Sequence, residues 1–213
     1  MLDKKEINKV IDLLLELYPD AKAELNFTNP FELLIATILS AQCTDVRVNK
    51  TTDSLVKDLK TPEDYLKLTE EELGKRIYSC GFYKTKSKNI LETCRILIEK
   101  HNGKVPETIE ELMELPGVGR KTANVVVSNA FGTPAIAVDT HVFRVSNRIG
   151  LSNSKNVLDT EKDLMKNIDK NMWTKAHHLL IFHGRRVCKA RNPLCEECPI
   201  RPYCFYYKNR REK

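Results

Sequence analysis

The stretch Leu115–Val127, LPGVGRKTANVVV, runs from a glycine-punctuated turn directly into an amphipathic helix. Two glycines two positions apart, in Pro116–Gly119, let the backbone turn sharply and approach another molecule closely. Apolar residues then recur on one side of the helix that follows, and a further helix is expected just before the turn. The sequence therefore predicts a helix–hairpin–helix unit over about residues 108–127.

The helix after this turn is a candidate anion-binding site. Because the helix begins at once, its unpaired N–H groups and the positive end of its dipole point out of the turn. That combination binds an anion, and phosphate is the usual one. Lys121 falls in the first turn of this helix. A lysine there is more often a solvated surface residue than a functional one, so further features have to decide its role.

Composition places the chain among globular proteins. Of its 213 residues, 41% are hydrophobic and 30% are charged. The N-terminus lacks the apolar segment of a secretion signal, and the longest apolar run, around Leu33 to Ala41, is too short to span a bilayer. The net charge is +6, and residues 185–213 alone carry nine Lys or Arg against three Glu. This basic end favours a polyanionic partner, although such a run is more often a solvated tail.

Almost every segment has the pattern of a helix. Asp3 and Glu6 predict a capping box, Asn29 with Pro30 predicts the start of an apolar core helix, and Thr44 is expected to cap the helix after it. No convincing strand pair or repeat is found, so we expect an all-α fold with short loops. Residues 22–132 are expected to form one helical domain. The first helix is expected to pack with the C-terminal third, which gives a second domain from residues 1–21 and 133–213.

Four of the seven cysteines crowd near the C-terminus with the spacing C-x6-C-x2-C-x5-C. Structural zinc takes four thiolates, but its usual pattern is two C-x2-C pairs, and only one pair occurs here. A cubane iron–sulfur cluster also takes four thiolates and tolerates uneven loops, so the spacing favours iron–sulfur over zinc. The candidate ligands are Cys188, Cys195, Cys198 and Cys204.

The other three cysteines, Cys43, Cys80 and Cys94, are too far apart in sequence for a local metal motif. We expect them to be buried core thiols. An odd number of cysteines with this clustering is not a disulfide framework and indicates an intracellular protein with a metal site.

Three features coincide in this chain: the hairpin LPGVGRKTANVV, the segment VDTHVFRV, and the C-terminal cysteine spacing. Together they closely resemble the endonuclease III family of DNA base-excision repair glycosylases, over nearly the whole chain. The resemblance also covers ELNFTNPFELLIATILSAQCTDVRVNK and CRILIEKHNGKVPE. It implies two helical domains with a DNA-binding cleft between them. One contains the helix–hairpin–helix, and the other holds a 4Fe-4S cluster in a C-terminal loop.

The resemblance also implies roles for individual residues. The family's nucleophilic lysine falls on Lys121, the aspartate of its VDTH motif on Asp139, and the cluster ligands on the four C-terminal cysteines. Gln42 corresponds to a glutamine that fills the gap left by an extruded base. Phe82 stands where relatives often carry a leucine wedge; phenylalanine can also intercalate, so this role is kept as a hypothesis. Further DNA contacts are expected at Gly117, Val118, Gly119, Arg120, Thr122 and His141.

The implied reaction is bifunctional excision of oxidised pyrimidines from duplex DNA. A glycosylase must take its target base out of the stack. The Lys121 amine would attack the sugar C1′, displace the base and form a Schiff base, after which β-elimination cuts 3′ to the abasic site. Asp139 would accept a proton and stabilise positive charge, and it can also cap a helix. The partner would be double-stranded DNA with damaged pyrimidines or abasic sites. The enzyme would be a cytoplasmic, nucleoid-associated monomer without membrane attachment.

The amine has to be neutral to react, and this requirement limits the role of the hairpin. Near neutral pH, deprotonating a lysine costs about 4 kcal/mol. A helix N-terminus contributes roughly 0.3–1 kcal/mol, so desolvation in a closed cleft is expected to supply the rest.

Three other functions were weighed against this one. A mismatch-directed glycosylase of the same superfamily is disfavoured because those relatives usually lack the hairpin lysine. A non-catalytic DNA-binding module would not need Lys121 together with Asp139. An iron–sulfur redox sensor is weakened because no partner redox motif is present.

Overall fold

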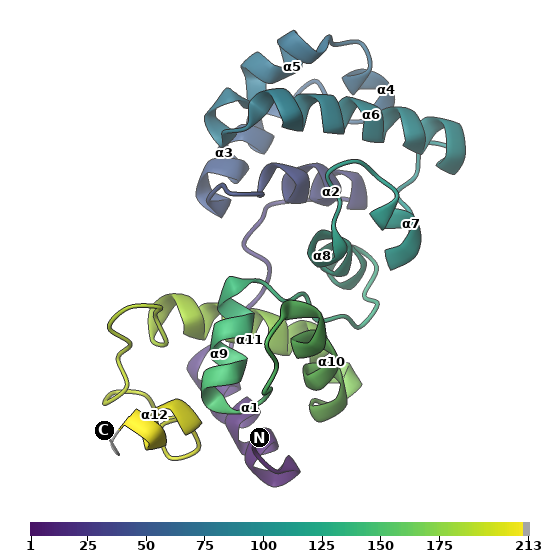
Figure 1. The fold of residues 1–213 in the computed structure, drawn as a ribbon. Helices are drawn as coiled ribbons and strands as arrows, with labels where there is room; N and C mark the ends of the chain where they lie inside the picture. The colour runs from purple at the N-terminus through teal and green to yellow at the C-terminus, as the bar shows by residue number, and fades with distance from the viewer. Residues whose placement is uncertain (211–213) are drawn as a thin grey trace. The chain divides into compact units, whose positions relative to one another are not determined.

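The computed structural model describes residues 1–210; Arg211, Glu212 and Lys213, the end of the basic segment, lie outside the described residues. Over residues 1–210 all regular secondary structure is helical, which confirms the all-α prediction (Figure 1). No helix in this range is long and apolar enough to cross a membrane. The α-helices are α1 (Lys4–Leu17), α2 (Pro30–Leu39), α3 (Asp45–Leu55), α4 (Pro62–Tyr65), α5 (Glu70–Ile77), α6 (Tyr83–His101), α7 (Ile109–Met113), α8 (Arg120–Ala130), α9 (Thr140–Ile149), α10 (Val157–Asn167), α11 (Trp173–Arg186) and α12 (Phe205–Arg210). Two 3-10 helices, η1 (Tyr78–Cys80) and η2 (Lys170–Met172), precede α6 and α11.

The described chain forms two compact units. The first unit combines Met1–Lys22 with the chain from Pro134 onward, and the second unit is Ala23–Thr133. Both ends of the chain therefore contribute to the same unit.

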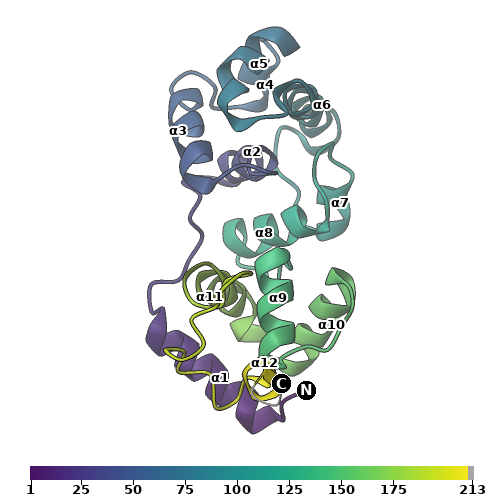
Figure 2. The ribbon, with the colours of Figure 1, turned by 60° about the vertical axis from the view of Figure 1, so that its left-hand side comes forward.

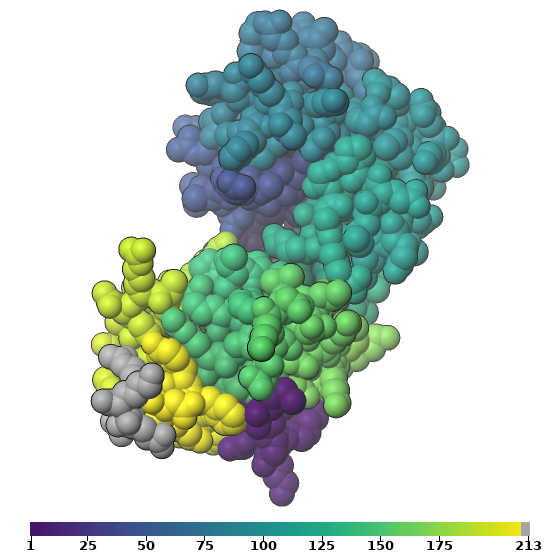
Figure 3. All heavy atoms as spheres, viewed as in Figure 1, coloured from purple at the N-terminus to yellow at the C-terminus, as the bar shows by residue number. Residues whose placement is uncertain are grey.

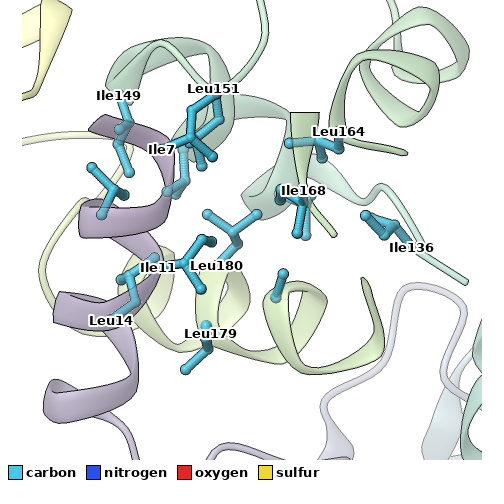
Figure 4. Packing of buried hydrophobic residues seen from close by; sticks show 14 of the residues in the cluster. Ile7, Ile11, Leu14, Ile136, Ile149, Leu151, Leu164, Ile168, Leu179 and Leu180 are labelled. Carbon is cyan, nitrogen blue, oxygen red and sulfur yellow. The ribbon is translucent and has the colours of Figure 1, made fainter. Parts of the chain in front are cut away.

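The core of the first unit joins the N-terminal helix to the C-terminal third (Figure 4). Ile11 and Leu14 of α1 lie in one cluster with Leu179 and Leu180 of α11. The expected packing of the first helix is thus found. Fully burying one such side chain contributes about 1.5–3 kcal/mol, so this cluster is the main attachment of α1. At its start, the expected Asp3–Glu6 capping box is present.

The second unit is built around α2, whose side chains are buried on nearly every face. This helix packs against α3, α6 and α8 (Figure 2). The helix begins where the sequence predicted, with Pro30 in its first turn. The Asn29 side chain caps it by accepting from the Glu32 N–H at 2.9 Å. The predicted core helix is confirmed.

Three local features were not predicted from the sequence. Thr44 stands at the N-cap of α3 but its side chain makes no capping hydrogen bond. The run 135–138 is buried although it has no regular secondary structure. The short helix α12 had no clear sequence signal; it packs on α9, where the Phe205 ring covers Gly150.

Candidate active-site and cluster-binding regions

The hairpin between α7 and α8 is a tight turn fixed by its own backbone and by α6. Gly117 adopts φ +80°, in the left-handed region that favours glycine. A Cβ at this position would approach Asn89 Nδ2 to 3.1 Å, so the turn is also closely packed. The Val118 N–H donates to the Leu115 carbonyl at 3.1 Å, and the Thr93 hydroxyl donates to the Pro116 carbonyl at 3.1 Å. The turn is therefore formed without any ligand.

The second glycine of the hairpin has a different role from the first. Gly119 has φ −91°, which any residue can adopt, and a Cβ there would meet no heavy atom within 4 Å. The left-handed turn itself therefore requires glycine only at Gly117, whereas Gly119 leaves open space beside the helix start. Gly119 is the N-cap of α8, and the helix start has no side-chain capping hydrogen bond. Arg120 and Lys121 are exposed beside it, and Thr122 is half-buried.

Gln42 and Phe82, on two loops of the second unit, both have positive φ, at +54° and +48°. Neither residue type favours this region, and an L-residue there costs roughly 1–2 kcal/mol. Both side chains are exposed, Phe82 to 63%. Such strain persists only where the surroundings impose it, and it clusters at functional sites.

Asp139 caps α9 in the first unit, with Oδ1 accepting from the Val142 N–H at 2.7 Å. The capping role considered from the sequence is therefore found. His141 follows in the first turn, half-buried, with Nδ1 3.1 Å from Arg144 Nη2. Arginine only donates, so His141 Nδ1 is the acceptor. Lys121 belongs to the second unit.

The four C-terminal cysteines line one small, partly open cavity in the first unit. The pKa of Cys198 is raised to about 11, mainly by burial. The backbone N–H of Ile200 acts to lower this pKa, and the other three cysteines act to raise it. Free thiolates are thus disfavoured here, and bound metal charge would reverse this. In residues 1–210, no three His, Cys, Asp or Glu side chains are placed to hold a single metal ion. The donor set fits an iron–sulfur cluster, which takes four cysteine thiolates.

Two arginines of α9 hold the start of the cysteine loop, and the sequence reading missed both. Arg144 donates to the carbonyls of Gly184 and Cys188, and Arg148 donates to those of Lys189 and Ala190. The segment from α11 through this loop to α12 forms part of the first unit's surface (Figure 3). The signal that could have identified these arginines is their i, i+4 spacing on a helix whose other face is apolar.

A buried polar chain also reaches the cavity. The Tyr18 hydroxyl lies 3.1 Å from His183 Nδ1, and His183 Nε2 lies 3.6 Å from Cys198 Sγ. Burial lowers the pKa of His183 to about 4, so the ring is neutral and carries one N–H. A liganding thiolate only accepts, so Nε2 would donate to sulfur and Nδ1 would accept from Tyr18.

The remaining cysteines follow the sequence expectation only in part. Cys80 and Cys94 are buried, as expected, and burial raises the pKa of Cys94 to about 12. Cys43 is not a core residue; it is half-buried in the loop that follows α2.

Sequence comparisons agree with this geometry. Residues 35–170 match the HhH-GPD superfamily of base excision DNA repair proteins, and residues 188–204 match the iron–sulfur binding domain of endonuclease III. Endonuclease III of Bacillus subtilis is 50% identical over 100% of this chain and 98% of its own length. The chain belongs to the endonuclease III family. Endonuclease III of Escherichia coli is 49% identical over 96% of this chain and 97% of its own.

Solved structures of the endonuclease III family agree as well. A trapped endonuclease III–DNA covalent intermediate superimposes with a TM-score of 0.94 and 53% identity, covering 99% of this chain and 100% of that one. A thermostable thymine-DNA glycosylase gives a TM-score of 0.87 at 26% identity over 96% and 98% of the two chains. Family membership makes this chain a bifunctional DNA glycosylase/AP lyase of base excision repair, with a 4Fe-4S cluster as its cofactor.

Proposed function

We propose that this enzyme excises oxidised pyrimidines from double-stranded DNA through a Schiff base on Lys121, then cuts 3′ to the abasic site by β-elimination. It acts as an intracellular, nucleoid-associated monomer.

The observation that carries this proposal is the start of α8. Lys121 is an exposed amine in the first turn of a helix whose N-cap provides no capping side chain. Gly119 has open space where a side chain would be, although nothing inside the protein requires a glycine there. A DNA phosphate fits this position, because the positive end of the helix dipole attracts it and no Cβ blocks it.

The phosphate would position the nucleotide without reading its sequence. The amides of Gly117 and Gly119 would hold it, and Val118, Arg120 and Thr122 would add contacts beside them. The Lys121 amine would then attack C1′, the bond to the base would break, and the resulting imine would acidify the C2′ proton for elimination.

Asp139 would stabilise the positive charge that develops at C1′ and accept a proton. Its Oδ1 already accepts from the Val142 N–H, which fixes the orientation of the carboxylate before DNA arrives. His141, in the first turn of α9, would contact the DNA beside it.

Gln42 would fill the gap left by the extruded base, and Phe82 would wedge into the duplex. Both lie exposed at the tips of their loops in the strained conformation described above. Base–aromatic stacking is worth about 1–3 kcal/mol per base, so an exposed phenylalanine suits the wedge position.

Cys188, Cys195, Cys198 and Cys204 would hold the 4Fe-4S cluster, which would fix the shape of the basic loop around it. Because the cluster and four thiolates leave net negative charge, nearby arginines would offset it. That would leave less of the C-terminal positive charge for DNA than the sequence count suggests.

Borohydride trapping tests the nucleophile. Duplexes carrying thymine glycol, an abasic site or an A·8-oxoguanine mispair are incubated with wild type, Lys121→Gln and Lys100→Gln. We expect a covalent adduct on the first two duplexes with wild type and no adduct with Lys121→Gln. Lys100→Gln changes an exposed lysine of the same unit and should trap normally.

An adduct at full yield with Lys121→Gln would remove Lys121 as the nucleophile. If an adduct formed only on the A·8-oxoguanine duplex, the enzyme would be a mismatch-directed glycosylase and not one that excises oxidised pyrimidines. For the cysteines, iron and acid-labile sulfide are measured in an anaerobic preparation, and zinc in place of iron would overturn the ligand assignment.

A further inference from the structure

Two loops of the second unit lead to the strained residues Gln42 and Phe82. The first follows the last residue of α2, Leu39, and the second follows the last residue of η1, Cys80. Nothing in the local sequence explains how loops almost 40 residues apart are held in matching conformations. Because strain of this kind persists only when neighbouring contacts impose it, a buried interaction must fix both loops.

Lys86 of α6 provides that interaction. Its side chain is only 5% exposed, and its Nζ donates to the Leu39 carbonyl at 2.8 Å and to the Cys80 carbonyl at 2.9 Å. One ammonium group therefore joins the backbone three residues before Gln42 to the backbone two residues before Phe82. Its own N–H also donates to the Phe82 carbonyl at 3.0 Å.

The two acceptors explain why a cation is stable at this buried position. Leu39 is the last residue of α2, and terminal carbonyls of a helix lack partners within the helix. A lysine ammonium both satisfies such a carbonyl and lies at the negative end of the helix dipole. Burial lowers the pKa of Lys86, whereas the nearby thiols of Cys43 and Cys80 act in the opposite direction.

Side chains around Lys86 extend the connection to α3. Thr51 Oγ1 lies 3.1 Å from Ser79 Oγ and accepts from the Cys80 thiol at 3.4 Å. The Cys80 thiol raises the pKa of the nearby Cys43, whose pKa is raised first of all by burial. The polar groups between α2, α3, η1 and α6 thus form one connected network, and Lys86 is its charged member.

We propose that Lys86 is a positioning residue that sets the spacing of the Gln42 and Phe82 loops, so that both side chains enter the DNA together when a base is turned out. This proposal rests on the proposed roles of Gln42 and Phe82. Lys86 itself touches no DNA. Its loss should impair reactions that require insertion into a duplex and spare a reaction that requires none.

The test compares Lys86→Met, which keeps an unbranched stem without donors, with Lys88→Met, an exposed lysine of the same helix. Single-turnover borohydride trapping is measured on a thymine glycol duplex and on a single strand carrying an abasic site. For Lys86→Met we expect adduct trapping on the duplex to be at least tenfold less efficient. Most of this loss should appear in the dependence of the trapping rate on concentration. On the single strand, the trapping rate should change less than twofold. Lys88→Met should match wild type on both.

A double-mutant cycle separates positioning from general destabilisation. In a Gln42→Ala, Phe82→Ala background, adding Lys86→Met should cost less than a further twofold on the duplex, because the residues that it positions are gone. Lys86→Arg, which keeps a charged donor, should recover part of the duplex activity. If Lys86→Met does not fold, Lys86→Gln, whose amide can reach one of the two carbonyls, takes its place with the same expectation.

Equal losses on duplex and single strand would mean that Lys86 only stabilises the fold, and would overturn the proposal. The proposal would also be overturned if Lys86→Met caused its full loss of duplex trapping in the Gln42→Ala, Phe82→Ala background. If the Gln42→Ala, Phe82→Ala enzyme reacts with the duplex like wild type, the insertion roles fail and this proposal fails with them. If that enzyme is impaired while Lys86→Met equals wild type, this proposal alone is wrong.

Discussion

The helix–hairpin–helix and the cysteine loop are both short segments, but different interactions hold them in place. The hairpin is fixed by one left-handed glycine, by the buried residues Leu115 and Val118 and by the Thr93 hydroxyl on the Pro116 carbonyl. The cysteine loop has few buried apolar side chains; its start is held by arginines of α9 and its centre is a cavity lined by thiols.

This difference indicates when each segment acquires its structure. The hairpin is held by contacts within its own unit, which fix its shape for binding a phosphate. The loop instead surrounds groups that are costly to ionise without metal, since burial and mutual repulsion raise the pKa of Cys198. For such a site, the free energy of metal binding contributes directly to folding. The hairpin is therefore expected to be independent of the cluster, and the loop is not.

The largest effect is expected from removing one of the cysteines proposed to hold the cluster. Cys195→Ser should lose the bound iron and destabilise the first unit by several kcal/mol, as losses of structural metal sites generally do. Iron analysis and hydrogen exchange check this. Exchange should increase in the first unit, which includes α9 and α11, while residues 115–130 stay protected.

Cys43→Ser serves as the control, because Cys43 is a half-buried cysteine outside the loop. It should retain iron and the exchange pattern of wild type. Loss of protection in the hairpin of Cys195→Ser, to the same extent as in the loop, would show that the two segments do not fold independently.

A smaller effect is expected when the loop loses an arginine contact. Arg144→Lys keeps the charge but loses the planar fork that reaches both the Gly184 and Cys188 carbonyls. Hydrogen bonds to charged groups contribute about 1.5–3 kcal/mol, so we expect a loss of stability of about this size and faster release of iron. Thermal unfolding and the decay of cluster absorbance measure the two.

The matched exchange Arg95→Lys alters an exposed ion pair with Glu92 in the second unit. Exposed pairs contribute about 0–1 kcal/mol, so this variant should melt close to wild type and keep its iron. An Arg144→Lys enzyme indistinguishable from Arg95→Lys would mean that the arginine does not hold the loop.

Local signals in the sequence were sufficient for the helices and their caps. Asp3, Asn29 and Asp139 cap helices because a side-chain oxygen three residues before an N–H determines that geometry locally. Even so, Thr44 shows that a capping residue type does not guarantee the bond. The catalytic assignment of Lys121 came from family resemblance, because an exposed lysine in a first turn has no distinctive local pattern.

The contacts that sequence reasoning missed join residues far apart in the chain. Lys86 reaches a carbonyl 47 positions away, and Arg144 reaches one 44 positions away. A lysine within an amphipathic helix is normally solvated, so its burial depends on which unpaired carbonyls the fold brings near it. That information lies in the tertiary structure and not in the spacing of residue types.

The smallest expected effect compares the two hairpin glycines. Gly117→Ala forces an L-residue to φ +80° and brings Cβ to 3.1 Å from Asn89 Nδ2, so it should cost about 1–2 kcal/mol. Gly119→Ala meets no atom within 4 Å at an ordinary φ, and its stability should change by only about 0.5 kcal/mol. Thermal unfolding gives both values.

For DNA affinity, Gly119→Ala should have the larger effect of the two substitutions, because its methyl group would occupy the space proposed for the phosphate. With Gly119→Ala, affinity for an abasic duplex should fall severalfold while the melting temperature stays near that of wild type. With Gly117→Ala, the loss of stability should be the larger change. If Gly119→Ala melts as low as Gly117→Ala and binds normally, then the fold itself requires the second glycine, and the open space beside it is not where the phosphate binds.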